Sequence, residues 1–533
     1  MAERGVVVIG AGHNGLACAA YLARAGLKVT VLERRPRVGG ACVTEELWPG
    51  YRVSRAAYVV GLLRPRIARE LELERHGLRL LPRSPASFTP LPDGRALVLG
   101  AGLESDVEEI RRFSARDAEV FPRFEAFVER VARAVEPTLD APPPELSLRG
   151  PRDAVPWWLA LRAGLRLRRE LPRAARLLLG PARDLLEEWF DSEPLRGTLA
   201  TDAVIGAFAP PSAPGTGYVL FHHVMGSVTG ERGIWAYAQG GMGELSEALA
   251  ASARAAGASI RAEAPVAHIR VEGSRASGVA LANGDEIAAD AVVSSLDPAL
   301  TFLRLLDASA LPEEFVRAVR GLDFRSPVVK LNLALSELPR FRTHDRESAP
   351  LTGTVHVGAT DLDALERAFD DARSGDVSEV PLAELTIPSV VDPSLAPAGR
   401  HVASVFAQYA PARAMDDAEW PALRDRMRDR IVASIETLAP GFSDSILESE
   451  VLAPPDLESE FGLTGGNIFH GAMTPDRLLF LRPVPDWARY RTPVDSLYLC
   501  GAGTHPGGGV MGACGRNAAR EILRDLGVRR AAR

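Results

Sequence analysis

The sequence predicts an α/β protein with a parallel, Rossmann-like sheet and a second domain inserted into it. Three blocks of chain indicate this fold, because the first, a middle and the last block each combine apolar strand patterns with glycines that open a helix. The length of 533 residues exceeds what one simple core accommodates, so two or three domains are expected.

The first block carries a dinucleotide-binding pattern. Residues 6–9 (VVVI) form a continuous apolar run, which is typical of a parallel strand buried on both faces. A GxGxxG motif follows, in which the first glycine permits a tight turn and the second lets the backbone approach a pyrophosphate at the start of a helix. We expect cofactor contacts from Gly10, Gly12, His13, Asn14 and Gly15.

The end of the second strand distinguishes between cofactors. Residues 29–32 have the pattern of that strand, and Glu33 closes it about 20 residues after the motif, where a carboxylate accepts ribose hydroxyls and disfavours the 2′-phosphate of NADP. A further glycine pair follows directly and suits the longer body of a flavin dinucleotide. We therefore expect FAD, contacted by Glu33, Arg34, Gly39, Gly40 and Ala41.

The last block supplies a second helix start. Residues 497–500 are predicted to form a strand, and a glycine-rich loop then leads to a helix that begins near Val510. A helix N-terminus preceded by bare backbone suits the negative charge that a reduced flavin develops. We expect contacts with the cofactor from Gly501, Gly508, Gly509 and Val510.

The middle block resembles the other two in pattern. A helix is predicted to follow the glycines of residues 240–243, and strands are predicted at 266–271, 276–281 and 291–295, with Asn283-Gly284 as a hairpin turn between two of them. From this block we expect cofactor contacts by Gly241, Met242 and Val266.

Five long motifs resemble those of the flavin amine oxidase and phytoene desaturase superfamily, and most closely those of its carotenoid and retinoid oxidoreductase branch, the pyridine nucleotide-disulfide oxidoreductase domain-containing protein 2 family. They are GAGHNGL, GYVLFHHVMG, QGGMGELSEALA, GGNIFHGAM and YLCGAGTHPGGGVMGACGRNAA. The resemblance implies an FAD-dependent oxidoreductase with non-covalent FAD in a discontinuous, glutathione-reductase-like domain of residues 1–75, 238–305 and 490–530. Residues 76–237 and 306–489 would then form an α+β substrate domain with a helical subdomain.

The family name suggests dithiol chemistry, but the cysteines do not support it. Cys42 follows the glycine pair, where a CxxxxC pair would begin, yet Leu47 stands at the second position. The four cysteines lie in apolar or glycine-rich segments and are expected to be reduced thiols of a cytoplasmic protein. No second complete nucleotide fingerprint is present, so FAD alone is expected, without a pyridine nucleotide site.

Two nearly uncharged segments, 203–243 and 463–475, adjoin the cofactor blocks. They predict either packed core or the wall of an apolar cavity, and we favour the cavity because of their position. His223 and its neighbour His222 are candidates for a direct role, although core histidines are more common. His505 lies in the loop expected beside the flavin ring, where it either contacts the cofactor or braces the turn at Pro506.

Lys330 is a further candidate for catalysis. The chain has only two lysines, Lys28 and Lys330, and Lys330 interrupts the apolar strand pattern of residues 328–335. In amine oxidases of the superfamily a lysine on a comparable strand holds a water near flavin N5. A buried ammonium beside the flavin would favour a developing anion or activate oxygen, whereas the alternative is a lysine at a strand end that reaches solvent.

Residues 151–190 are predicted to be helical and of a different character. Leucines alternate with arginines, and Trp157 and Trp158 stand at one end. The pattern indicates either an amphipathic surface that contacts a membrane peripherally or ordinary surface helices with a solvated basic face. No apolar run long enough to span a bilayer is predicted.

These observations predict an enzyme that removes hydrogen from, or isomerises, a small apolar, isoprenoid-like substrate, with hydride passing to flavin N5 and electrons on to oxygen or a quinone. Amine oxidation and a flavin-bound scaffold with little turnover are the alternatives. The net charge of −7 argues against nucleic acid as a partner, and no metal site is expected. The sequence leaves the oligomeric state open.

Overall fold

The computed structural model describes residues 4–145, 154–228, 230, 232–347, 349–411 and 417–528. The first residues of the predicted helical region, 151–153, and the outermost residues of the predicted FAD domain, 1–3 and 529–530, lie outside the described residues.

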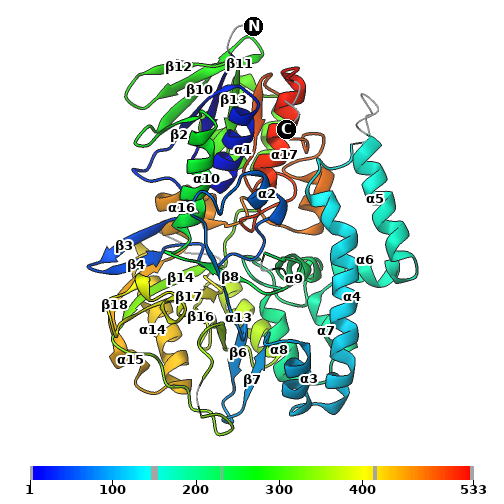
Figure 1. The fold of residues 1–533 in the computed structure, drawn as a ribbon, viewed down its shortest axis with the longest axis vertical. Coiled ribbons are helices and arrows are strands. Elements are labelled where there is room, and N and C mark those ends of the chain that lie inside the picture. Colours follow the sequence, from blue (N-terminus) through cyan, green and yellow to red (C-terminus); the bar gives the residue numbers. More distant parts are fainter. Residues whose placement is uncertain are drawn as a thin grey trace.

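A five-stranded parallel sheet forms the centre of the upper body in Figure 1, in the order β19-β13-β1-β2-β9. Each of its strands lies within one of the three ranges that the sequence assigned to the FAD domain. Its strands are β1 (Gly5–Ile9), β2 (Lys28–Leu32), β9 (Ser259–Arg261), β13 (Ala291–Ser294) and β19 (Leu497–Leu499).

Strand β1 is buried on both faces, as a continuous apolar run predicts. Val6 and Val8 pack into the core beneath α1 (His13–Arg24), α10 (Gly243–Ala255) and α17 (Ala513–Asp525). Val7 and Ile9 pack into a second core, under a three-stranded antiparallel sheet. That sheet consists of β10 (Val266–Glu272), β11 (Arg275–Leu281) and β12 (Glu286–Ala288).

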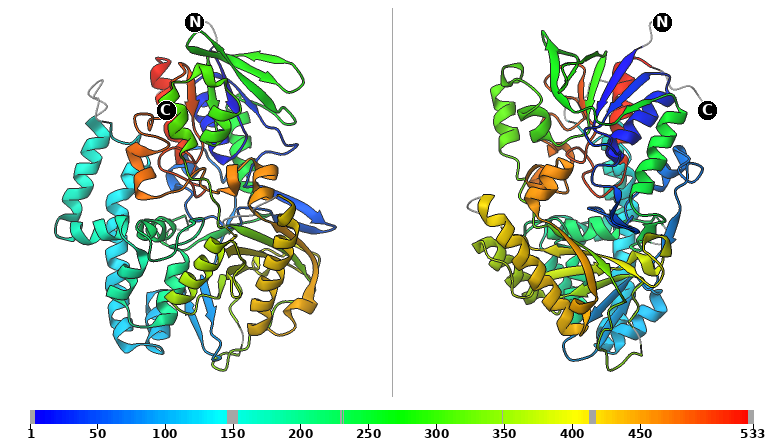
Figure 2. Two further views of the ribbon diagram at one scale, coloured as in Figure 1. Left: turned by 180° about the vertical axis from the view of Figure 1, so that it is seen from behind. Right: turned by 90° about the vertical axis from the view of Figure 1, so that its left-hand side faces the viewer.

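Segments from the start, the middle and the end of the chain lie side by side in this body. Helix α1 packs against both α10 and α17, and the views of Figures 1 and 2 show the blue, green and red segments together. The fold class is therefore confirmed as α/β, with a Rossmann-like domain assembled from distant parts of the sequence.

A seven-stranded sheet dominates the lower body, in the order β18-β14-β17-β16-β15-β6-β7. Its pairs are antiparallel except for β15 and β6. Helix α14 (Trp420–Leu438) packs on one face through a shared core. On the other face of β14, Ala334 packs with Tyr51 and Val53 of the segment that follows the glycine pair. The strands are β6 (Ser87–Pro90), β7 (Ala96–Leu99), β14 (Val329–Leu335), β15 (Thr354–Val357), β16 (Leu382–Thr386), β17 (His401–Gln408) and β18 (Ile446–Leu452).

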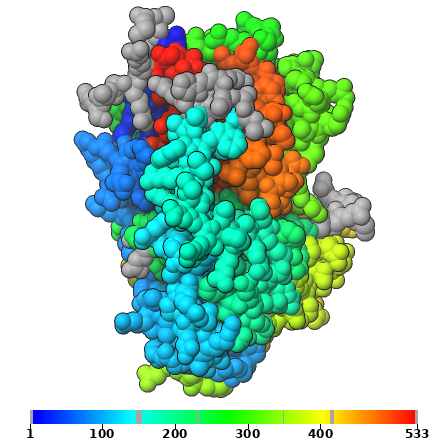
Figure 3. Space-filling view, turned by 90° about the vertical axis from the view of Figure 1, so that its right-hand side faces the viewer, coloured from blue at the N-terminus to red at the C-terminus, as the bar shows by residue number. Residues whose placement is uncertain are grey.

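Helices form a third layer, which makes up much of the face in Figure 3. They are α3 (Leu103–Arg111), α4 (Ala115–Leu139), α5 (Ala154–Leu167), α6 (Leu171–Leu179), α7 (Ala182–Trp189), α8 (Glu193–Thr201) and α9 (Thr216–Val224). The remaining helices are α2 (Pro65–Glu70), α11 (Pro298–Leu303), α12 (Glu313–Arg320), α13 (Leu362–Ser374), α15 (Phe442–Ser445) and α16 (Pro454–Phe461). Two strand pairs complete the fold: β3 (Thr44–Trp48) with β4 (Tyr51–Ser54), and β5 (Leu80–Pro82) with β8 (Ala236–Ala238).

Two local predictions need correction. The last helix begins at Ala513 rather than near Val510, because Gly512 adopts a left-handed conformation immediately before it. The turn at Asn283-Gly284 joins β11 to the short β12, which the sequence analysis missed, and β13 instead pairs with β1 in the parallel sheet.

Candidate functional site

A cavity of about 560 Å³ begins at the glycine motif after β1. Gly10 has a φ of +89°, and Gly12 is the N-cap of α1 without a side-chain cap, so the first amides of the helix lack an acceptor from a capping side chain. A Cβ on Gly12 would meet no protein atom within 4 Å, whereas a Cβ on Gly15 would lie 2.2 Å from the carbonyl oxygen of Gly10. Gly12 therefore leaves room for a ligand, and Gly15 for the packing of the chain itself.

The carboxylate of Glu33 lies at the end of β2, on the cavity wall. The amides of Ala11 and Arg35 each donate to one of its oxygens, at 2.8 and 3.0 Å. These bonds fix the carboxylate and leave a lone pair on each oxygen, which is the arrangement that two ribose hydroxyls need. Arg34 lies beside it and donates to the carbonyl oxygens of Ser459 and Glu460.

The second glycine pair forms the adjoining wall. Gly39 pairs with Gly12 in an isolated parallel bridge, and its amide donates to the carbonyl oxygen of Ala11 at 2.8 Å. Gly39 and Gly40 have φ values of +124° and +56°. The backbone can therefore run close to Gly12 and present Ala41 to the cavity.

The structure brings most of the predicted site residues together. Those that line the cavity are Gly10, Gly12, His13, Asn14, Gly15, Glu33, Arg34, Gly39, Gly40, Ala41, His223, Val266, Lys330, Gly509 and Val510.

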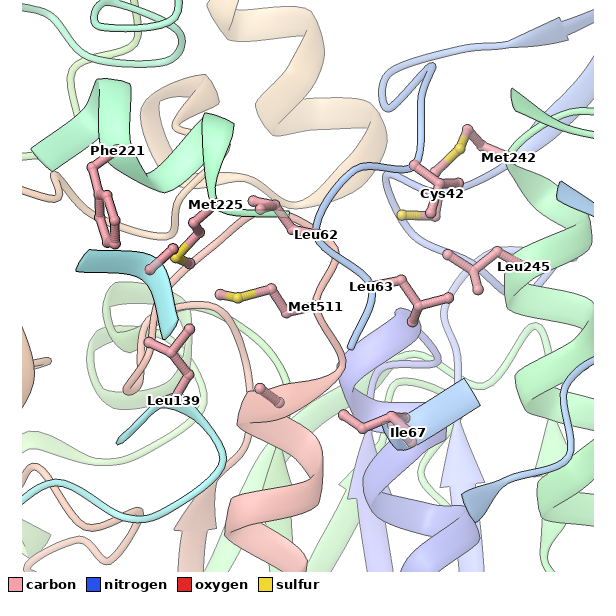
Figure 4. Packing of buried hydrophobic residues seen from close by; sticks show 14 of the residues in the cluster. Cys42, Leu62, Leu63, Ile67, Leu139, Phe221, Met225, Met242, Leu245 and Met511 are labelled. Carbon is pink, nitrogen blue, oxygen red and sulfur yellow. The ribbon is translucent and has the colours of Figure 1, made fainter. Parts of the chain in front are cut away.

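Four glycine-block residues lie behind the wall instead. Gly501 packs against Ser295, and a Cβ there would lie 2.3 Å from its carbonyl oxygen; Gly508 accepts a hydrogen bond from His222. Gly241 and Met242 pack on the hairpin of β3 and β4, and Figure 4 shows Met242 beside Cys42 in the core. Their direct contact with the cofactor stays a prediction, and their observed role is to support segments that do line the cavity.

Beyond the glycines the cavity wall is apolar. Its side chains come from helix, loop and sheet segments far apart in the sequence: Leu62, Ile205, Trp235, Val328, Phe406, Leu463, Ile468 and Phe469. The uncharged segments noted in the sequence thus contribute to a cavity wall, as favoured, and also to packed core.

Lys330 on β14 faces this apolar part of the cavity. Its side chain is 1% exposed, its Nζ lies 4.6 Å from the centroid of the Tyr58 ring, and it has no hydrogen-bond partner among the described residues. Burial lowers the pKa of Lys330 to about 7, against the opposing effect of Glu450. A free amine is therefore available on the wall above neutral pH.

The histidines divide between wall and core. His223 lines the cavity, and its Nδ1 lies 2.8 Å from the carbonyl oxygen of Val219. Burial lowers the pKa of His223 to about 4, so it is neutral near neutral pH. His505 is not among the wall residues, and its Nε2 lies 3.1 Å from the carbonyl oxygen of Thr138. His505 thus ties its loop to the end of α4, and both its contact with the cofactor and its bracing of the turn at Pro506 stay predictions.

Sequence reasoning missed two electrostatically coupled acids, Glu384 and Asp202, that lie close to wall residues. The Tyr58 hydroxyl, on the cavity, donates to Glu384 on β16 at 2.7 Å. Burial raises the pKa of Glu384 to about 6, although Tyr58 and Arg83 oppose the rise. Burial and the charge of Glu384 raise the pKa of Asp202 to about 8. These residues come from three distant segments, so no local motif could have indicated them.

The wall residues fit an extended flavin dinucleotide. An uncapped helix start accepts a pyrophosphate, Glu33 accepts ribose hydroxyls, and several buried polar atoms on the wall lack partners in the described chain. These atoms are His13 Nε2, Asn14 Oδ1, His470 Nδ1 and Lys330 Nζ.

Within the described residues, no cluster of ligands suits a metal ion. No helix there has the length and apolarity needed to cross a bilayer. The four cysteines are buried and unpaired, and burial raises the pKa of Cys42 to about 12, which leaves it a thiol.

Comparisons with known proteins agree with this site. The family model for flavin-containing amine oxidoreductases matches residues 15–523. Pyridine nucleotide-disulfide oxidoreductase domain-containing protein 2 of Rattus norvegicus is 47% identical over 98% of this chain and 94% of its own length. The hydroxyneurosporene desaturase of Cereibacter sphaeroides is 30% identical over 98% of both chains.

A solved structure of putrescine oxidase with bound putrescine has the same fold, with a TM-score of 0.63 at 19% identity over 99% of both chains. Together with the cavity wall formed by the glycine motif and the second glycine pair, these matches identify the cofactor as a flavin. The chain belongs to the flavin-containing amine oxidoreductase family and, within it, to the pyridine nucleotide-disulfide oxidoreductase domain-containing protein 2 group of FAD-dependent oxidoreductases.

Proposed function

We propose that this oxidoreductase acts on an apolar, isoprenoid-like substrate. It either dehydrogenates the substrate and passes the two electrons to oxygen or a quinone, or isomerises it without net electron transfer. The observation that carries the proposal is the absence of a carboxylate on the wall around Lys330. Among the described residues only two acids line the cavity, Glu33 and Glu458. Glu33 belongs to the nucleotide end, and Glu458 is close in sequence to the carbonyls that Arg34 contacts.

An amine substrate fits this wall poorly. Most amines are protonated near neutral pH. Around Lys330 the described cavity wall offers histidines and Tyr58, whose hydroxyl already donates to the buried Glu384, but no acid of its own. A buried cation without a carboxylate partner is penalised by several kcal/mol. The sequence similarity to a hydroxyneurosporene desaturase supports an uncharged substrate with an isoprenoid chain.

The protein's own groups can orient such a substrate and manage its proton. A bound flavin supplies the acceptor for two electrons. Phe406 and Trp235 offer flat apolar surfaces against which such a substrate can pack. Removal of hydrogen across a C–C bond also releases a proton, and Lys330 Nζ is a basic atom on this wall that can accept it. Lys330 Nζ lies over the ring of Tyr58, whose hydroxyl donates to Glu384.

We further propose that FAD binds non-covalently and that the protein is cytoplasmic. Cys42 lines the cavity, but its raised pKa makes it a poor nucleophile. Four unpaired buried thiols are typical of a reducing compartment.

Anaerobic titration of the flavin-loaded protein tests the substrate class. We expect detergent-solubilised carotenoid precursors to bleach the flavin absorbance and putrescine to leave it unchanged. Bleaching by putrescine alone would establish amine oxidation instead. Bleaching by dithionite but by neither substrate class would count against dehydrogenation of isoprenoids and favour a binding role with little turnover.

A further inference from the structure

Exposed apolar side chains concentrate in one short part of the chain. Of twelve large hydrophobic side chains exposed among the described residues, seven lie within residues 155–179. Five of them belong to α5 and are 40–61% exposed. We call these five the Trp–Leu face: Val155, Trp157, Trp158, Leu161 and Leu165.

Helix α5 is apolar on two opposite sides. Pro156 and Leu167 are buried, and the helix packs against α4. Trp158, Leu161 and Leu165 follow at a spacing of three and four residues, which places them together on a side away from the buried residues. A helix that only covered α4 would carry polar residues on the side that faces away from α4. The Trp–Leu face on that side therefore indicates contact with another apolar surface.

The charge around this face is opposite to that of the whole chain. Residues 154–179 contain six arginines and one glutamate, whereas the chain carries a net charge of −7. The glutamate, Glu170, already pairs with Arg130 at 2.5 Å. Arg168 and Arg169 are exposed and form no ion pair within the described part of the chain. The guanidinium of Arg162 lies 5.1 Å from the centroid of the Trp158 ring.

We propose that α5 docks in the plane of an anionic lipid surface, with the Trp–Leu face in the headgroup and acyl boundary and the arginines on lipid phosphates. Tryptophan is favoured at that boundary because its ring has an apolar body and a polar edge. The surplus of positive charge provides the electrostatic attraction to anionic lipid. A second copy of the chain is disfavoured as the occupant, because two such faces would bring their arginines together.

Vesicle flotation of the flavin-loaded protein tests this surface. The vesicles contain either phosphatidylcholine alone or equal parts of phosphatidylcholine and phosphatidylglycerol. We expect flotation only with phosphatidylglycerol, reduced by high salt. The Trp158→Ser/Leu161→Ser variant should lower the bound fraction about tenfold or more. The Arg168→Gln/Arg169→Gln variant should also weaken binding to the anionic vesicles.

A matched control replaces Val380 and Leu447 with serine, because they are similarly exposed (55% and 46%) but lie in the lower body. This variant should float like the wild type. The proposal is overturned if the wild type binds neither vesicle, or if the Trp158/Leu161 variant floats unchanged. It is also overturned if the wild type is a dimer that this variant dissociates, since the face would then be a contact between copies. None of these outcomes depends on the substrate, so they are independent of the proposed reaction.

Discussion

Replacing Lys330 with methionine removes a buried ionisable group and keeps a long unbranched side chain. The Lys330 side chain is 1% exposed, and burial lowers its pKa from 10.5 to about 7. At about 1.4 kcal/mol per pKa unit, this difference corresponds to about 5 kcal/mol. That figure is an upper value for the free energy by which the buried, protonated Lys330 opposes folding.

The sign follows from proton binding. Between pH 7 and 10.5 the unfolded chain keeps the Lys330 proton and the folded chain has lost it. Folding is therefore opposed most strongly below pH 7, and the cost fades as the pH approaches 10.5. The Lys330→Met variant should accordingly have a higher Tm than the wild type, with a gap that is widest in mild acid and narrows in base.

Differential scanning calorimetry in excess FAD, over a pH series from about 6 to about 10, measures this gap. Lys28→Met is the matched control, because Lys28 is the chain's other lysine and is exposed. The plot of Tm against pH for Lys28→Met should run parallel to that of the wild type. A Lys330→Met curve that also runs parallel would refute the reasoning, because burial would then not disturb the titration of Lys330.

Other substitutions separate cofactor binding from folding. Gly12→Val should weaken FAD binding roughly a hundredfold or more, because the new side chain fills the room that Gly12 leaves for the ligand. Circular dichroism should stay native, because a Cβ at Gly12 meets no protein atom within 4 Å. Gly15→Val should instead lower stability by about 1–3 kcal/mol, since its Cβ would lie 2.2 Å from a carbonyl oxygen. Glu33→Gln should raise the Kd for FAD about tenfold in an equilibrium dialysis assay, and full retention would mean that the ribose lies elsewhere. His505→Gln should leave the flavin spectrum unchanged and cost about 1 kcal/mol of stability, whereas a shifted spectrum would place His505 at the ring.

The glycine motif and Glu33 could be predicted because their roles are local. A strand, a tight turn, a helix start and an acid follow one another within a short segment, and the structure places all of them on one cavity. Lys330 could be found because a lone lysine interrupts an apolar strand pattern.

Glycines elsewhere were harder to interpret. A glycine marks a close approach of the backbone to some other group, and the sequence does not say whether that group is a ligand or the protein. At Gly501 it is the backbone of Ser295, and at Gly241 it is the side chain of Thr44. The pairing of Tyr58 with Glu384 depends on how distant segments meet, so no spacing in the sequence indicates it.

Because α17 packs against α1, the body that contains α1 can be completed only after the C-terminal helix has been synthesised. During synthesis the first strand and helix have no C-terminal neighbour. The side of α1 around Asn14 and Cys18, which α17 later covers, therefore stays open. Contacts between such distant segments form slowly and leave nascent apolar surface in need of chaperones. A chain cut short before residue 513 should therefore be degraded rather than accumulate as a stable apoprotein.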